Sequence, residues 1–215
     1  MRKELITLFV LMTLSLLLVG CESDSTAPNE DLPPLESQDV ATQSGAMATS
    51  MMQALPRIWD PTTNKAIGEY QYSFFGGFVT GTVFSEFRDT EGGNLVDHGV
   101  AGWARIYTED PLVVTLFDDG IPWLLGFDIE ADIDQALDQA IANGSGSLTV
   151  GDYLATFTVS DVVVAQGSDY PTSGTISFTS GGITATVTFN GSGNAAVTVG
   201  DDSWIIDLDN GSISG

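Results

Sequence analysis

The chain has 215 residues, of which 29 are acidic and 6 basic, so its formal net charge is −23 at pH 7. No Lys or Arg follows Arg105, whereas Asp and Glu continue towards the C-terminus. A nucleic-acid-binding protein needs Lys and Arg to replace the counterions around phosphate, so the composition excludes that class and excludes attraction to anionic lipid headgroups. The acidity itself is compatible with solubility, with a saline habitat, with a basic partner and with divalent cations.

The first twenty residues have the pattern of a secretory signal peptide. Arg2 and Lys3 give a positive start, and an apolar run follows from Leu5 to Val19. Signal peptides carry an apolar core of about 7–15 residues. This run is shorter than the roughly 20 residues that a membrane-spanning helix needs. We therefore expect residues 1–20 to be removed on export.

Residues 18–21 read Leu-Val-Gly-Cys, which resembles the lipobox of bacterial lipoproteins. The resemblance covers residues 1–21 only. It implies cleavage between Gly20 and Cys21, a diacylglycerol on the Cys21 thiol, and acyl chains such as palmitate that hold the protein on a membrane. Glu22 departs from the Asp that favours inner-membrane retention in Gram-negative lipoproteins, which implies the outer membrane where the organism has one. Cys21 is the only cysteine, so a disulfide and a thiol nucleophile are excluded.

The next segment has the composition of a disordered chain. Residues 22–45 are rich in Ser, Asp, Glu, Pro, Gln and Thr and contain no aromatic residue. We predict a lipidated, disordered tether over residues 21–45. Met47, Met51 and Leu55 then recur every four residues, which predicts a short helix over 46–55 that Pro56 ends. Residues 46–66 would form the entry to the folded domain.

From residue 67 to residue 215 the pattern is that of an antiparallel β domain. Residues 183–189 alternate apolar and polar side chains without error, which is typical of a strand with one buried face. Turns rich in Gly, Asn and Asp separate such runs. The other predicted strands are 68–75, 78–88, 99–108, 112–117, 125–131, 147–164 with a bend near Ser160-Asp161, 173–180, 195–199 and 203–208.

A second helix is predicted from Asp132 to Asn143, because Ile133, Leu137 and Ile141 recur at helical spacing and Gly144 would follow its end. Its start is open, since residues 127–133 also alternate as a strand does. No repeat of about 20–50 residues is evident, which argues against a solenoid or propeller. The predicted fold is all-β: a single antiparallel β-sandwich or barrel-like domain with one short α-helix.

No sequence pattern identifies a catalytic site. His98 is the only histidine, and no serine stands in the Gly-x-Ser-x-Gly pattern that places a nucleophile before a helix. A zinc site is not expected with one His and no available Cys. Pairs of carboxylates can serve a glycosidase, but here they are so abundant that nothing ranks them. The pairs are Asp118-Asp119, Asp201-Asp202 and Asp128/Glu130.

Oxygen ligands gather in three predicted turns. Calcium accepts about six to eight oxygens in irregular geometry, so a calcium site is one option for these turns. The last of these turns, which contains Asp207 and Asp209, does not match the twelve-residue helix–loop–helix pattern of calcium-binding loops. No other cofactor is indicated. The candidate ligands are Asp118, Asp119, Asp201, Asp202, Asp207 and Asp209.

These features predict a lipid-anchored, non-catalytic binding or structural module of the bacterial cell envelope, with a protein or glycan partner that the sequence does not name. One alternative is a small hydrolase of envelope polysaccharide with paired carboxylates. Another is a carrier whose β cavity holds an apolar ligand against Phe74, Phe75 and Phe78. A filled core would favour the binding or structural module. A cleft with two carboxylates within about 10 Å would favour the hydrolase. An apolar cavity of about 300–1,000 Å³ would favour the carrier.

Overall fold

The computed structural model describes residues 36–55, 64–74, 79–115 and 122–215. They belong to one compact unit, Pro34–Gly215. The predicted signal peptide, the predicted lipobox and residues 22–35 of the predicted tether lie outside the described residues. Within the described ranges, no helix combines the length and the apolar character that crossing a membrane requires.

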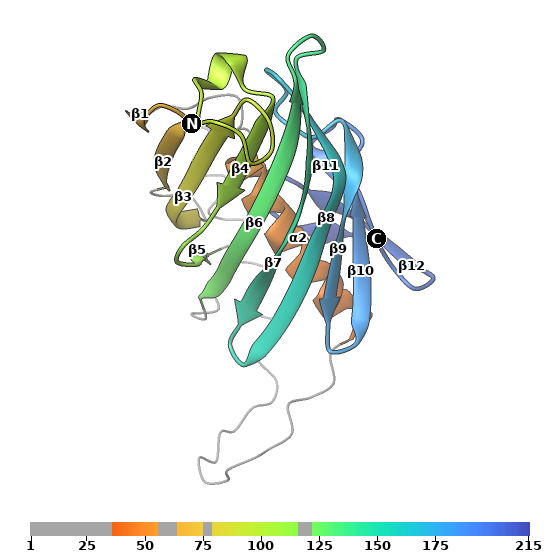
Figure 1. Cartoon of the computed structure of the whole chain (residues 1–215). Helices are drawn as coiled ribbons and strands as arrows, with labels where there is room; N and C mark the ends of the chain where they lie inside the picture. The colour runs from red at the N-terminus through yellow and green to blue at the C-terminus, as the bar shows by residue number, and fades with distance from the viewer. Residues whose placement is uncertain (1–35, 56–63, 75–78, 116–121) are drawn as a thin grey trace, which may run out of the picture. The chain divides into compact units, whose positions relative to one another are not determined.

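In the described part of the chain, thirteen strands form one antiparallel sheet, and most strands pair with their neighbours in the sequence (Figure 1). The predicted all-β class with one helix is confirmed. β4 and β5 lie one after the other between β3 and β6, since each of the two pairs with both. The strands are β1 (Asn64–Ala66), β2 (Glu69–Phe74), β3 (Val79–Arg88), β4 (Trp103–Tyr107), β5 (Leu112–Val114), β6 (Trp123–Asp134), β7 (Gln139–Val150), β8 (Tyr153–Ala165), β9 (Ser173–Ser180), β10 (Ile183–Thr188), β11 (Asn194–Val199), β12 (Asp202–Asp207) and β13 (Ile213–Ser214).

The helix α2 (Ser37–Ala54) lies on the inner side of the curled sheet (Figure 1). Its residues 40–51 are buried on nearly every side, with Thr42 as the partly exposed exception. The helix packs against β9 to β13. Small inward-facing side chains on β10 and β11 allow it to approach the sheet closely. These side chains are Ala185, Val187, Ala195 and Val197.

At Gly45, α2 approaches the turn between β12 and β13 closely. A Cβ at this position would lie 3.0 Å from the carbonyl oxygen of Gly211. Larger inward-facing residues on β6 and β8, such as Phe127 and Phe157, belong to the same hydrophobic core as α2. The inner side of the sheet is therefore occupied by its own helix and core side chains.

The predicted tether is wrong over residues 37–45, which form the first half of α2. The small polar residues of this segment suggested that it could not be buried. In the structure their small size lets the helix fit inside the sheet, and three hydroxyls bond within the helix itself. Thr42 Oγ1 donates to the Gln38 carbonyl at 2.9 Å. Ser44 Oγ donates to the Ala41 carbonyl at 2.7 Å, and Ser50 Oγ donates to the Ala46 carbonyl at 2.8 Å.

The second predicted helix, Asp132 to Asn143, is also wrong. These residues form the end of β6, a four-residue turn and the start of β7. The alternating pattern of residues 127–133 prevailed over the helical spacing, because it continues a strand with one buried face. Ile133 is buried, whereas Leu137 lies in the turn and is 64% exposed. The predicted run 147–164 is likewise two strands, the end of β7 and most of β8.

The predicted bend near Ser160-Asp161 is confirmed. The pairing of β8 with β9 shifts register between Ser160 and Val163. Asp161 has a φ of 49°, in the left-handed region that residues other than Gly rarely adopt. Its backbone N–H donates to Asn143 Oδ1 at 2.9 Å, so the bulge is held by a side chain of the neighbouring strand.

Candidate functional site

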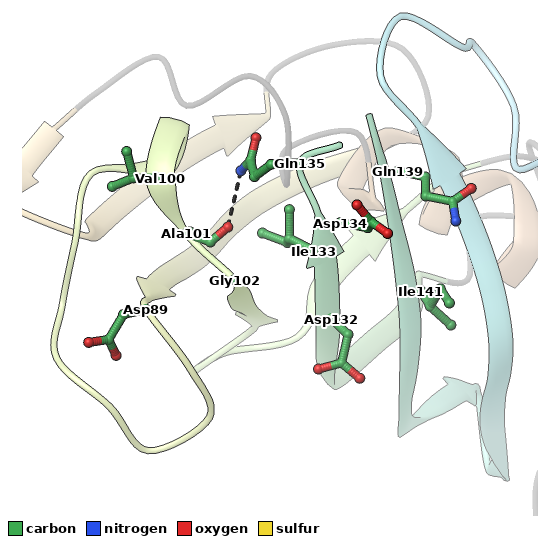
Figure 2. A pocket seen from close by; sticks show the side chains of 10 residues that line it. All are labelled: Asp89, Val100, Ala101, Gly102, Asp132, Ile133, Asp134, Gln135, Gln139 and Ile141. Atoms are coloured by element: carbon green, nitrogen blue, oxygen red, sulfur yellow. Dashed lines mark hydrogen bonds between the residues drawn. The ribbon is translucent and has the colours of Figure 1, made fainter. Parts of the chain in front are cut away.

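An open hollow of about 510 Å³ lies where the β6–β7 turn meets residues 98–102 (Figure 2). The short 3-10 helix η2 (His98–Val100) forms part of one wall. The lining combines carboxylates from Asp89, Asp132 and Asp134, amides from Gln135 and Gln139, and apolar groups such as Val100 and Ile141. Such a mixture can bind a ligand that presents both polar and apolar groups.

Hydrogen bonds hold the two walls of the hollow together. The Ile133 N–H donates to the Gly102 carbonyl at 3.0 Å, and Gln135 Nε2 donates to the Ala101 carbonyl at 3.0 Å (Figure 2). Gly102 is required here, since a Cβ would lie 2.5 Å from the Asp89 carbonyl oxygen. These contacts fix the shape of the hollow before any ligand arrives.

Asp89 organises the loop beside the hollow. Its Oδ1 accepts the backbone N–H groups of Thr90 at 2.8 Å and Asn94 at 2.9 Å. Desolvation tends to raise the pKa of the Asp89 carboxyl, but the hydrogen bonds from Thr90 and Asn94 outweigh it and leave the pKa below its usual value. Asp89 therefore has a structural role in this loop.

The two aspartates of β6 differ in what they can offer to a ligand. Asp134 Oδ1 accepts the N–H groups of Ala136 at 2.9 Å and Leu137 at 3.1 Å, and so shapes the β6–β7 turn. Asp132 is exposed, and its carboxylate accepts no hydrogen bond from any described residue. Asp132 and Asp134 are two residues apart on β6, so they share a face and lie about 7 Å apart. Because Asp89 and Asp134 already accept backbone N–H groups, Asp132 is the carboxylate of the hollow that is free to bind.

The predicted pair Asp128/Glu130 lies on the same face of β6, next to an ion-pair network. Arg105 Nε donates to Asp128 Oδ1 at 2.7 Å, and Arg88 pairs with Glu86 at 3.1 Å. The hydrogen bond from Arg105 to Asp128 raises the pKa of the Arg105 guanidinium. Because Asp128 is engaged by Arg105, this pair is not free to act as two catalytic carboxylates.

The predicted calcium ligands are not brought together by the described structure. Asp201 and Asp202 lie at one end of β12, and Asp207 and Asp209 lie at the other, a separation of about 17 Å along the strand. Asp209 Oδ1 accepts the Tyr170 hydroxyl at 2.6 Å. Across the described ranges, no group of three or more His, Cys, Asp and Glu side chains could hold a metal ion. The remaining candidates, Asp118 and Asp119, lie outside those ranges, as do Gly20 and Cys21.

His98 belongs to η2, and its ring lies edge-on to Phe87 with centroids 5.7 Å apart. Its carbonyl oxygen accepts a second, longer hydrogen bond from Gln135 Nε2 at 3.4 Å. The contacts described for His98 therefore link the η2 segment to the core and to the β6–β7 turn.

The hollow was not predicted from the sequence. Its residues come from three separate segments, and the β6–β7 turn lies inside the region predicted as a helix. The available signal was the alternation of acidic residues at positions 128, 130, 132 and 134, which places all four on one face if the strand continues. The contribution of Val100 could not be read from any local pattern.

Comparisons of the chain with protein-family models, with curated proteins and with solved structures found no match. The chemistry of the described residues and the motif at Cys21 are therefore the basis for assigning a function.

Proposed function

We propose that the chain is a lipid-anchored, non-catalytic binding module of the bacterial cell envelope. The anchor rests on the lipobox that ends at Cys21, and an exported protein with this motif is held on a membrane by its acyl chains. Glu22 favours the outer membrane in an organism that has one. The binding role rests on the hollow at the β6–β7 turn.

The observation that carries the binding role is the division between the inner and outer sides of the sheet. The inner side is occupied by α2, whose residues 40–51 are almost wholly buried. A carrier would need that side for its ligand, and Phe74 is buried in the core there, while Phe75 and Phe78 lie outside the described residues. The hollow is instead open to solvent and lined by mixed side chains. This arrangement favours recognition at the surface.

The hydrolase alternative also has an observation in its favour, since Asp132 and Asp134 share the hollow. However, Asp134 Oδ1 already accepts two backbone N–H groups. The hollow lacks an aromatic side chain among its described lining residues. Incubating the mature protein with purified envelope polysaccharide separates the two functions. A binding module releases no reducing ends, whereas release that Asp132→Asn abolishes would replace this proposal with the hydrolase.

The anchor is tested by metabolic labelling with radioactive palmitate and by membrane fractionation. Cys21→Ser should lose the label and leave the membrane fraction, because the thiol is the acceptor of the lipid. Ser25→Ala is the matched control, since it changes the same segment without touching residues 18–21. Retention of label by Cys21→Ser would show that the lipobox does not direct lipidation.

A further inference from the structure

Two exposed apolar side chains lie on segments that form the hollow, one among its lining residues and one in the turn between the lining residues Gln135 and Gln139. Val100 on η2 is 69% exposed, and Leu137 in the β6–β7 turn is 64% exposed. Gln135 joins the two segments through its hydrogen bonds to the carbonyls of Ala101 and His98. A partner that covered both segments would bury these two side chains.

Asp132 lines this hollow (Figure 2), and its carboxylate pairs with no cation among the side chains that the structure describes. Of the arginines in the described part of the chain, Arg88 pairs with Glu86, and Arg105 pairs with Asp128 and more weakly with Glu86. Both are therefore engaged on the neighbouring part of the sheet. With 29 acidic and 6 basic residues in the whole chain, a cation for Asp132 is more readily supplied by another molecule.

We propose that the hollow is the docking site for a Lys or Arg side chain of a protein partner, with apolar neighbours of that side chain covering Val100 and Leu137. Long basic side chains bury their aliphatic stems against apolar surface while the charged group reaches a carboxylate. Ile141 and Val100 provide apolar surface in the lining of the same hollow. The inference rests on the proposed binding function and names the chemistry of its partner.

The test uses the mature chain, residues 21–215, carrying Cys21→Ser and labelled with ¹⁵N, at about 0.15 M ionic strength to limit long-range attraction. The probe is the peptide acetyl-Leu-Lys-Leu-amide. Its uncharged counterpart carries norleucine in place of Lys, and spermidine serves as a cation without apolar neighbours. The expected result is that the lysine peptide shifts the amide signals of Gly102, Asp132 and Gln135 and binds about fivefold more tightly than either comparison ligand.

Two substitutions separate docking from diffuse charge attraction. Asp132→Asn should weaken binding of the lysine peptide about fivefold. Val100→Ser should weaken binding of both the lysine peptide and the norleucine peptide. The urea unfolding midpoint of each variant should stay near that of the parent protein. Asp201→Asn is the matched control, because it removes the same charge from the exposed β11–β12 turn. Equal loss in Asp201→Asn, or equal binding of spermidine, would overturn the proposal.

The outcome is independent of the tests of the proposed function. The labelled chain lacks the lipid acceptor and needs no turnover, so failure of the anchor or evidence of hydrolysis would leave the peptide result standing. Conversely, absence of peptide binding together with palmitate labelling of Cys21 would rule out a basic side chain as the ligand of the hollow. It would leave the proposed lipid-anchored binding module in place.

Discussion

The ring of Phe157 on β8 occupies the space directly over Gly146 on β7, where a Cβ would collide with the ring and with the carbonyl oxygen of Gly126. Gly146 pairs with Phe127 on one side and with Phe157 on the other. Because Gly146 has no side chain, the rings of Phe127 and Phe157 on the two neighbouring strands can share the inner face of the sheet. The glycine is thus part of the core packing.

Gly146→Ala should therefore destabilise the protein by about 1–3 kcal/mol, since overpacking a core forces side chains and backbone to move. The measurement is urea unfolding followed by tryptophan fluorescence. Gly99→Ala is the control, because a Cβ at Gly99 meets no atom within 4 Å. Similar midpoints for the two variants would contradict the packing role of Gly146.

Thr49→Val should stabilise the protein by about 1 kcal/mol. Thr49 Oγ1 is buried inside α2 without a hydrogen-bond partner in the described structure, and removing an unsatisfied buried hydroxyl recovers its desolvation penalty. Thr42→Val should bring no gain, because Thr42 Oγ1 donates to the Gln38 carbonyl at 2.9 Å. A lower unfolding midpoint for Thr49→Val would mean that a buried water satisfies the hydroxyl.

Asp89 should make the stability of the protein depend on pH in the acid range. A carboxyl whose pKa is lowered by folding contributes stability that is present above its unfolded pKa, near 3.8, and is lost as pH falls through the folded pKa. The unfolding midpoint of the wild-type protein should thus fall more steeply below about pH 4 than that of Asp89→Asn. A ¹³C titration of the Asp89 carboxyl gives the same pKa directly. Parallel pH profiles for the two proteins would be incompatible with this role.

Deletion of residues 22–45 should abolish cooperative folding. The deletion removes the first half of α2, including the fully buried Val40 and Ala41. Loss of this half of the helix also opens the inner surface of β10 and β11 to water, and a domain is stable by only roughly 5–15 kcal/mol. Deletion of residues 22–34 is the control, because it removes none of the helix. The readout is the thermal unfolding transition of each purified protein. A sharp transition at the parent temperature in the longer deletion would show that α2 is dispensable.

The sequence by itself determined the antiparallel strands, because alternation with period two reports directly which side chains are buried. Residues 183–189 and the Gly-rich turns around them are clear cases, and a bend near Ser160-Asp161 was predicted within the run 147–164. The repeat of Met47, Met51 and Leu55 likewise predicted the C-terminal half of α2. These signals are local, so neighbouring residues are sufficient to reveal them.

Only the tertiary structure decided where α2 begins and that residues 132–143 form a hairpin. The segment 37–45 is polar and small, and its burial depends on the small side chains of β10 and β11, which lie about 140 residues away. The hollow depends on the same kind of long-range contact, since Gln135 reaches the carbonyl of Ala101. No local pattern contains the partner across such a distance, so the packing of the sheet selects among conformations that the local sequence leaves open.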